Sequence, residues 1–350
     1  MKILILTHKF YPDIGGIEIN SEILANYLYD SGYEIRIMTW SENSSFCTKE
    51  FPYSIVRNPN KFRILKEHKW ADLVFENNPC LKLSWPLLFL KKPHLITLHT
   101  WIQRLDGRKS IQDRLKLNWL NKAKTVIAVS NALKAGTYED ALVIENSYKE
   151  ELFKRMPEIS KTEDFVFLGR LVTDKGADMA IELIEMLKQT DMSLGKSSFK
   201  KLTIIGDGPE MENLKVLVND YNLKEVVNFT GALSGEDLVK KLNEHKYILI
   251  PSRWKEPFGI VALEGIACGC IPIVSNEGGL PDAIGNTGVV FERNNLQSLY
   301  NNVQTLLNNP LMDRILRSYF KKHLEDHTSK HVSEKYLKII HKSMYHYEEN

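Results

Sequence analysis

Residues 247–264 read Tyr-Ile-Leu-Ile-Pro-Ser-Arg-Trp-Lys-Glu-Pro-Phe-Gly-Ile-Val-Ala-Leu-Glu, and they hold one complete strand–loop–helix unit. The apolar run 247–251 predicts a strand that is buried on both faces. Pro257 and Gly259 predict a tight turn, and a helix that carries Glu264 is expected to follow it. A strand of this kind followed by a helix indicates an α/β fold with a parallel sheet.

The same unit recurs along the rest of the chain. Further runs that predict strands span 2–7, 34–39, 72–76, 94–99, 125–129, 141–144, 165–168, 201–205, 226–230, 271–275 and 288–291. Amphipathic stretches at 19–30, 177–188, 210–219 and 235–243 predict helices between them. The alternation indicates parallel sheets that are covered by helices on both faces.

A chain of 350 residues exceeds the usual size of a single core, so two domains are expected. The polar stretch 146–163 contains Pro157 and predicts the connection between them. We expect an acceptor-side domain over 1–157 and a second domain over 158–330, each a doubly wound Rossmann-like sheet, facing a cleft. The last helix, within 331–347, has no strand after it, so residues 331–350 could pack back on the first domain.

Composition excludes several classes of protein. The formal net charge is +2, too small to demand nucleic acid as a partner. Four cysteines without a CxxC pair make a zinc site or a disulfide framework improbable on this pattern. The N-terminal run 2–7 is too short for a signal-peptide core, and the run 81–90 is interrupted by polar residues and Pro86. These features predict a cytoplasmic protein, with contact to the inner face of a membrane left open.

The strand-end loops should carry the chemistry, because ligands of doubly wound sheets bind outside the carboxyl ends of the strands. Arg170 ends one strand, and Lys175 opens the next helix. Two cations at one such junction suit a diphosphate, although a solvated surface pair is the plain alternative. Gly15 and Gly16 after the first strand would let backbone amides approach an anion, or would form an ordinary turn.

The loop 251–259 adds carboxylates to these cations. Glu256 precedes the turn and Glu264 projects from roughly the second turn of the helix, and carboxylates accept hydrogen bonds from vicinal sugar hydroxyls. A capping or salt-bridge role is the alternative for both. The free amides of Phe258, Gly259 and Ile260 could face a phosphate. Backbone groups of the 231–233 segment could contact a base edge.

Taken in order, these motifs resemble the retaining glycosyltransferases of the GT-B fold, and the resemblance covers nearly the whole chain. The motifs are the first glycine pair, Gly-Arg…Lys-Gly, Gly206-Asp207-Gly208-Pro209-Glu210, and Glu-Pro-Phe-Gly-Ile…Glu at 256–264, which is similar to the family's Glu-x7-Glu signature. The chain departs from the family pattern at Thr100 and Ser147, where the family often has Asp and Gly. Both departures leave acceptor-side details open.

The resemblance implies a role for each matching residue. The implied donor-binding residues are Gly16, Arg170, Lys175, Gly231, Ala232, Leu233, Glu256, Phe258, Gly259, Ile260 and Glu264. The implied catalytic residues are Glu256, His99, Arg170 and Lys175. Glu256 would hold hydroxyls of the transferred sugar and Glu264 those of the ribose. His99 would lie beside the donor sugar, although a lone histidine at a strand end is more often structural.

The resemblance also implies the reaction. A hexose-type sugar would pass from a nucleotide-diphosphate sugar, with UDP- or GDP-sugar favoured, to a glycan or lipid-linked acceptor in cell-surface polysaccharide or glycoconjugate synthesis. Configuration would be retained, and no cofactor and no metal ion would be needed. The alternative is a non-catalytic partner protein of the same fold that binds a nucleotide sugar or another subunit.

The sequence contains fewer recognisable motifs for binding of the acceptor. Residues 104–124 contain seven cations and the apolar side chains of Ile111, Leu115, Leu117, Trp119 and Leu120. A basic helix of this kind could rest on an anionic membrane surface, or it could pack on the sheet with a solvated basic face. Phe10, Tyr11 and Trp101 could stack on an acceptor sugar or serve as packing.

Overall fold

The computed structural model of the chain describes residues 1–13, 15–42, 49–102, 108 and 110–348. The chain divides into two compact units. Unit 1 comprises Met1–Ser147 and Ser329–Asn350, and unit 2 comprises Tyr148–Thr328.

Unit 1 is built on a seven-stranded parallel sheet. Its strands are β1 (Lys2–Thr7), β2 (Glu34–Thr39), β3 (Ser54–Arg57), β4 (Leu73–Asn77), β5 (His94–Leu98), β6 (Thr125–Ala128) and β7 (Leu142–Val143). Its helices are α1 (Gly16–Asp30), α2 (Lys61–Trp70), α3 (Leu81–Ser84), η1 (Trp85–Leu88), α4 (Ile111–Leu120), α5 (Asn131–Thr137) and α14 (Ser329–Glu348). The strand order is β3-β2-β1-β4-β5-β6-β7, so the direction of winding reverses between β1 and β4.

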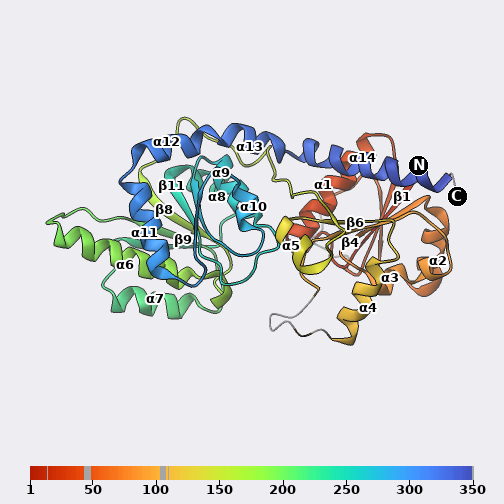
Figure 1. The fold of residues 1–350 in the computed structure, drawn as a ribbon, viewed down its shortest axis with the longest axis horizontal. Coiled ribbons are helices and arrows are strands. Elements are labelled where there is room, and N and C mark those ends of the chain that lie inside the picture. The colour runs from red at the N-terminus through yellow and green to blue at the C-terminus, as the bar shows by residue number, and fades with distance from the viewer. Residues whose placement is uncertain (14, 43–48, 103–107, 109, 349–350) are drawn as a thin grey trace. The chain divides into compact units, whose positions relative to one another are not determined.

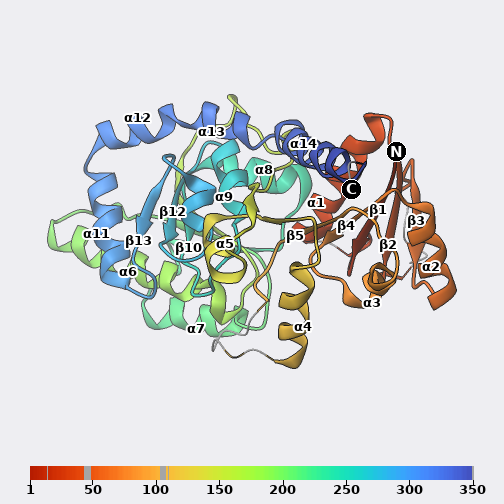
Figure 2. The ribbon, with the colours of Figure 1, turned by 45° about the vertical axis from the view of Figure 1, so that its right-hand side comes forward.

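The sheet of unit 1 is apolar on both faces because alternate side chains of β1 point in opposite directions. Ile3 and Ile5 pack in one cluster with side chains from α1 and α14, while Leu4 and Leu6 pack in another with side chains from α2 and α3. Figures 1 and 2 both show α14 running beside α1. The end of the chain therefore completes the core that its beginning starts.

Unit 2 is built on a six-stranded parallel sheet. Its strands are β8 (Glu163–Leu168), β9 (Leu202–Ile205), β10 (Val227–Gly231), β11 (His245–Ile250), β12 (Ile271–Ser275) and β13 (Val289–Phe291). Its helices are η2 (Thr173–Lys175), α6 (Ala177–Ser193), α7 (Met211–Asp220), α8 (Gly235–Glu244), α9 (Ile260–Ala267), α10 (Leu280–Ile284), α11 (Leu296–Leu307), α12 (Pro310–Ser318) and α13 (Phe320–Asp326). The strand order is β10-β9-β8-β11-β12-β13.

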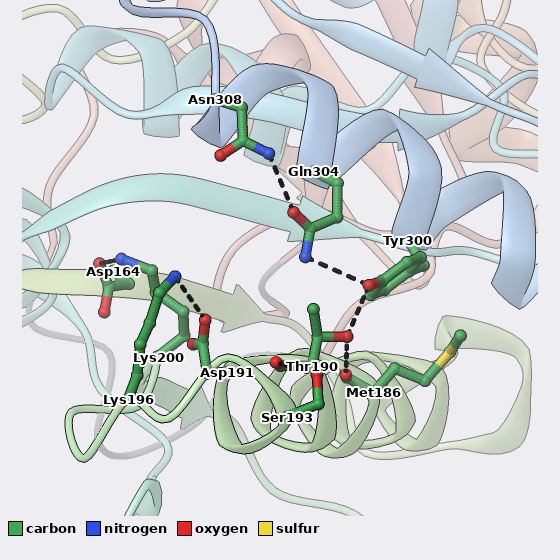
Figure 3. Close-up of polar contacts among 10 residues, drawn as sticks. All are labelled: Asp164, Met186, Thr190, Asp191, Ser193, Lys196, Lys200, Tyr300, Gln304 and Asn308. Carbon is green, nitrogen blue, oxygen red and sulfur yellow. Dashed lines mark hydrogen bonds and ion pairs between the residues drawn. The ribbon is translucent and has the colours of Figure 1, made fainter.

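One face of this sheet packs against α6, α7 and α11, whose buried side chains form a single cluster with Phe165 and Phe167 of β8. Polar contacts join two of these helices at their surface. Figure 3 shows the hydroxyl of Thr190 on α6 meeting the hydroxyl of Tyr300 on α11, at 2.7 Å. Gln304 donates to the same tyrosine oxygen at 3.3 Å. The bond between Thr190 and Tyr300 joins α6 to α11, and Gln304 supports it from within α11.

The polar stretch predicted as a connection between the domains lies within unit 2 from Tyr148 onward. Polar side chains of this stretch form hydrogen bonds with the carboxyl ends of helices in unit 2. Arg155 donates to the side chain of Asn243 at the end of α8, at 2.8 Å. The ammonium of Lys161 donates to the carbonyl of Cys268 at the end of α9, at 3.0 Å. Cations near helix carboxyl ends satisfy carbonyls that lack partners inside the helix.

Candidate functional site

The candidate donor site of unit 2 lies where β8 and β11 are neighbours. From β8 the chain winds outward to β9 and β10, and from β11 it winds to β12 and β13 on the other side. The loops after β8 and β11 therefore leave the sheet in opposite directions, which opens a crevice at the carboxyl ends of these strands. Arg170 and Lys175 follow β8, and Glu256 follows β11, so the fold brings the predicted cations and carboxylate to one place.

Lys175 and Glu256 form an ion pair across this crevice. The ammonium of Lys175 donates to Glu256 Oε1, and the hydroxyl of Ser252 donates to the same oxygen at 3.0 Å. Both charged side chains are mostly buried: 28% of the Lys175 side chain and 14% of the Glu256 side chain are exposed. Arg170 is exposed, and within the described part of the chain its guanidinium has no protein partner. A free guanidinium on the same strand-end loop leaves positive charge available for an anionic ligand.

Backbone hydrogen bonds join the loop after β11 to the loop that carries Lys175. The amides of Arg253 and Trp254 donate to the carbonyl of Asp174 at 2.8 and 3.2 Å. Arg253 also forms a two-pronged ion pair with Asp178 on α6, at 2.6 and 2.7 Å. Sequence reasoning did not single out this clamp, because the partners lie 75 positions apart.

Gly176 is required where the two loops touch. Its φ is +73°, and a Cβ built on it would lie 2.1 Å from the carbonyl oxygen of Pro251. A residue with a side chain would be strained by its backbone conformation and would also collide with backbone. Gly278 plays the same part on the other side, where a Cβ would lie 2.4 Å from the carbonyl oxygen of Glu256. The glycines of the sequence motifs thus let neighbouring loops approach closely.

The turn after Glu256 presents free amides. The side chain of Phe258 is buried, and α9 begins at Ile260 after Gly259 at φ +119°. Among the described residues, no protein acceptor receives the amides of Phe258, Gly259 or Ile260. Because the first amides of a helix lack internal partners, these groups suit a phosphate or a sugar oxygen.

Glu264 lies on α9, one turn past these amides. Burial raises the pKa of its carboxyl to about 7, and the charge of Lys149 opposes that rise. Its carboxyl oxygens have no hydrogen bond to another described residue. A half-buried carboxyl without a partner is suited to accept hydrogen bonds from vicinal hydroxyls of a ligand.

The segment from Gly231 to Leu233 begins at the last residue of β10, two strands away from β8. Neighbouring strands lie about 4.8 Å apart, so this segment is roughly 10 Å from the loop of Arg170. The carbonyl of Gly231 accepts the amide of Gly206 at 2.9 Å, which ties the two glycine loops together. The spacing is compatible with the predicted contact to a base.

Two predicted site residues lie in unit 1. Gly16 opens α1 after β1, and His99 follows β5. The Nε2 of His99 lies 3.0 Å from Asn77 Oδ1. Asn77 in turn donates its amide hydrogens to Ser21, and Ser21 donates to the carbonyl of Ile17 at 2.8 Å. This chain of donors leaves Asn77 Oδ1 as an acceptor, so Nε2 of His99 carries the proton.

The environment of His99 also keeps the imidazole neutral. Burial lowers its pKa to about 4 from an ordinary 6.5. Its backbone amide donates to Asn78 Oδ1 at 2.7 Å, which fixes the end of β5. Sequence reasoning missed both asparagines, although two amide side chains directly after a buried strand would have been a usable signal.

Several acceptor-side expectations are corrected by the structure. Phe10 is fully buried and packs on Phe51 with ring centroids 5.2 Å apart, so it belongs to the core and cannot stack on a sugar. Trp119 and Leu120 are buried, and the indole of Trp119 donates to Glu76 at 2.8 Å. The end of α4 therefore packs on the sheet, as the plain alternative held, because its apolar side chains have core partners.

The outer face of α4 differs from its inner face. Ile111 and Leu115 are 80% and 55% exposed, and Arg114 beside them is exposed as well. The cations Arg104 and Lys109 of the predicted basic segment lie outside the described residues. Over the described ranges, no helix is long and apolar enough to cross a bilayer. Nor do three or more His, Cys, Asp or Glu side chains gather there in a way that could hold a metal ion.

Comparison with known proteins follows the same division of the chain. A family model described as glycosyl transferases group 1 matches residues 148–323. The chain is 27% identical to an uncharacterized glycosyltransferase of Methanocaldococcus jannaschii, over 90% of this chain and 91% of that protein. It is 25% identical to the N-acetyl-alpha-D-glucosaminyl L-malate synthase of Bacillus anthracis, over 81% and 82%.

Solved structures share the fold of the chain. HepE of Anabaena, solved with UDP and glucose, superposes with a TM-score of 0.80 at 19% identity, over 98% of this chain and 100% of that one. The sucrose-phosphate synthase of Thermosynechococcus elongatus superposes with a TM-score of 0.78 at 19% identity, over 97% and 98%. With its two doubly wound parallel sheets and this family match, the chain belongs to the group 1 glycosyl transferases and has the GT-B fold.

Proposed function

We propose that the chain transfers a hexose-type sugar from a nucleotide-diphosphate sugar to a glycan or lipid-linked acceptor. The observation that carries this proposal is the Lys175–Glu256 ion pair, with the free guanidinium of Arg170 on the same strand-end loop as Lys175. A diphosphate needs cations, and a sugar needs hydrogen-bond acceptors for its hydroxyls. Both kinds of group meet at the switch point of unit 2.

The proposed reaction follows from the charges that develop. The bond between the anomeric carbon and the diphosphate oxygen breaks, which leaves negative charge on the phosphate and positive character on the ring. Arg170, Lys175 and the amides at the start of α9 stabilise the departing diphosphate without a metal ion. The acceptor hydroxyl attacks from the face that the leaving group departs, so configuration is retained and a phosphate oxygen is near enough to take the proton.

Other residues would position the two substrates. Glu256 would accept hydrogen bonds from hydroxyls of the transferred sugar, and Glu264 from those of the ribose. Gly16 would offer its amide to the donor phosphates. His99, with its proton on Nε2 and its imidazole neutral, would lie beside the sugar.

Relatives support a UDP- or GDP-sugar and a cell-surface or glycoconjugate product. HepE is described in complex with UDP and glucose. A mannosyltransferase of Mycolicibacterium smegmatis, 31% identical over 41% of this chain, is described as GDP-mannose-dependent and acting on a phosphatidylinositol monomannoside. A lipid-linked acceptor would fit peripheral contact of 104–124 with an anionic membrane, which sedimentation with neutral and anionic vesicles would test. Equal binding to both kinds of vesicle would exclude an electrostatic contact.

A thermal-shift screen with UDP-, GDP- and ADP-sugars tests the donor site. A ligand that binds only the native state raises the melting temperature. When free ligand is at a hundred times its Kd, the native state is stabilised by about 3 kcal/mol. We expect one nucleotide class to raise the melting temperature, and Arg170→Ala to reduce that rise. The exposed Lys224, also in unit 2, supplies the control Lys224→Ala, which should leave it unchanged.

No shift with any nucleotide, or an intact shift in Arg170→Ala, would refute the donor-site assignment. The different-class alternative is a non-catalytic partner protein of the same fold. It predicts a nucleotide-dependent shift without release of the nucleotide diphosphate when donor is incubated with or without acceptors. Release of the nucleotide diphosphate that depends on Lys175 would exclude it.

A further inference from the structure

A second pocket lies in unit 1, at the carboxyl ends of three neighbouring strands. It has a volume of about 300 Å³, and its walls come from His8 after β1, Trp40 after β2 and Pro79 after β4. The remaining walls are Leu81 and Lys82 of α3, with Gln112 and Lys116 of α4. Figure 2 shows these two helices at the same part of unit 1.

The position of this pocket is one that doubly wound folds use for ligands. The order β2-β1-β4 places it at the reversal of winding in unit 1. The His8 loop continues to Gly16, and the Pro79 loop follows directly after Asn77, the last residue of β4 and the partner of His99. The pocket is therefore joined by two short loops to both predicted site residues of this unit.

The lining is positive and carries no carboxylate. The ammonium groups of Lys82 and Lys116 have no hydrogen bond or ion pair with another described residue. Gln112 and Lys116 are four positions apart on α4, so both lie on the helix face toward the pocket. The nearby acid Glu76 is fully buried and does not line the pocket; its Oε1 accepts from Trp119 and its Oε2 accepts the amide of Cys80.

The pKa of His8 depends on the charges around the pocket. Burial lowers the pKa of His8, and the charges of Lys116 and Lys82 lower it further, while a bond to the Pro79 carbonyl at 3.3 Å and the charge of Glu76 oppose them. His8 is thus neutral near pH 7, and the two lysines supply the positive charge. Trp40 and Leu81 supply apolar walls, and an indole face suits the C–H face of a sugar.

We propose that this pocket binds an oxyanion, a phosphate or a carboxylate, that is carried by the sugar acceptor. The inference rests on the proposed transfer reaction and narrows it to acceptors with a negative charge. A volume of this size is at the small end of ligand pockets and fits one charged sugar-sized group. Lysine ammonium groups on short helices act as point charges for such a group.

Direct binding to the full chain tests the proposal without a donor. The probes are glucose, glucuronate, glucose 6-phosphate and inorganic phosphate, measured by titration calorimetry at low and high salt. We expect the anionic sugars to bind at least about tenfold more tightly than glucose, with an affinity that falls as salt rises. Lys82→Gln and Lys116→Gln should each weaken them roughly threefold to tenfold, since each removes one charged hydrogen-bond donor.

Two controls separate this result from folding and from the donor site. Lys224→Gln in unit 2 removes the same charge and should leave probe binding unchanged. The nucleotide-induced rise in melting temperature should persist in the double variant of Lys82 and Lys116. If no nucleotide raises the melting temperature of the unmodified chain, but the probes still bind in a lysine-dependent way, the proposed donor is wrong and the pocket assignment stands.

The anion could come from a soluble acceptor or from a lipid headgroup. Sedimentation with phosphatidylcholine vesicles, with and without phosphatidylglycerol, separates the two. Vesicle binding that the double variant loses identifies a headgroup, and lysine-dependent binding of the soluble probes alone identifies a soluble acceptor. The proposal is wrong if glucose binds as tightly as the anionic sugars. It is also wrong if the variant with both Lys82→Gln and Lys116→Gln binds the probes and the vesicles as tightly as Lys224→Gln does.

Discussion

At the residue scale, the donor site is organised by opposite charges that hold one another in place. Lys175 and Glu256 come from different loops, and their ion pair is supported by Ser252, whose hydroxyl donates to the same carboxylate oxygen. A partly buried ion pair of this kind contributes orientation more than stability, because desolvation offsets much of the attraction. Its removal should therefore affect the reaction more than the fold.

Replacement of Glu256 by Gln tests this distinction. The substitution keeps the size of the side chain but removes the negative charge that orients Lys175 and binds sugar hydroxyls. We expect kcat to fall roughly 10²- to 10³-fold, with a smaller change in the KM for the donor. The exposed Glu225, changed to Gln, is the matched control and should keep full activity. A Glu256→Gln enzyme with unchanged kcat would remove this residue from the reaction.

Glu264 gives a prediction about pH. Its folded-state pKa of about 7 lies above the ordinary 4.5 because burial disfavours the charged carboxylate. The native state thus holds the proton more tightly than the unfolded state, so stability is greatest below about pH 4.5 and is lost as pH rises through 7. The loss amounts to roughly 3 kcal/mol at most.

Urea unfolding at about pH 5 and about pH 8 measures this contribution. In Glu264→Gln the difference in unfolding free energy between the two pH values should shrink by up to that amount. Nucleotide binding should change the opposite way in the unmodified chain, strengthening as pH rises through 7, because ribose hydroxyls donate to the ionised form. If the substitution leaves the pH dependence of stability as it was, the carboxyl is not desolvated.

At the scale of elements, strand-end loops are packed so closely that glycine is needed where they touch. Gly176 and Gly195 offer a matched pair, since both have φ +73° but only Gly176 lies against another backbone. Changed to Ala, Gly195 should cost about 1–2 kcal/mol of stability for its backbone conformation alone. Gly176→Ala should cost roughly 2–5 kcal/mol, because the clash with Pro251 is added.

Activity separates the two variants further. Gly176 follows Lys175, so a displaced loop should move the ammonium away from Glu256 and lower kcat. The Gly195 variant should keep kcat near that of the unmodified chain, because this glycine follows α6 with open space around it. Chemical unfolding and steady-state kinetics on both variants supply the readouts. Equal losses of stability in the two variants would show that the Pro251 contact is not tight.

Elements with continuous apolar runs could be predicted from the sequence, since burial on both faces leaves a clear pattern. The predicted strands 2–7 and 34–39 coincide with β1 and β2. The edge strand β3 was missed because it has four residues and begins at the exposed Ser54. The fold class and the family are confirmed by the family match and by the solved structures.

The site was predictable only where residue types and spacing carry the signal. Arg170, Lys175 and Glu256 stand in recognisable loops, and the structure places the last two in contact. The clamp of Arg253 on Asp178 depends on two loops that only the tertiary fold brings together. The roles of these residues toward a donor stay predictions.

At the scale of the whole molecule, unit 1 is assembled from both ends of the chain. Val332, Tyr336 and Ile340 on α14 are four positions apart and form one apolar stripe. They pack with β1 and α1 in the same cluster. A helix at the end of the chain thus contributes to the core that holds Gly16 and His99.

Ile340 tests how much that contribution is worth. The side chain is fully buried, so Ile340→Ala should cost about 2–5 kcal/mol through lost burial and the cavity that remains. Ile315, 46% exposed on α12 of unit 2, supplies the control, and Ile315→Ala should change stability by less than about 0.5 kcal/mol.

Tryptophan fluorescence during urea unfolding can assign the loss to one unit. The tryptophans at 40, 70, 85, 101 and 119 lie in unit 1, and Trp254 alone lies in unit 2. The fluorescence transition should therefore shift to lower urea in Ile340→Ala, while the nucleotide-induced rise in melting temperature reports on unit 2. A loss confined to the nucleotide response, with the fluorescence midpoint unchanged, would contradict the assignment of α14 to unit 1. A shift of the midpoint alone would show that residues more than 300 positions from β1 stabilise its sheet, because Ile340 reaches the core only through the fold.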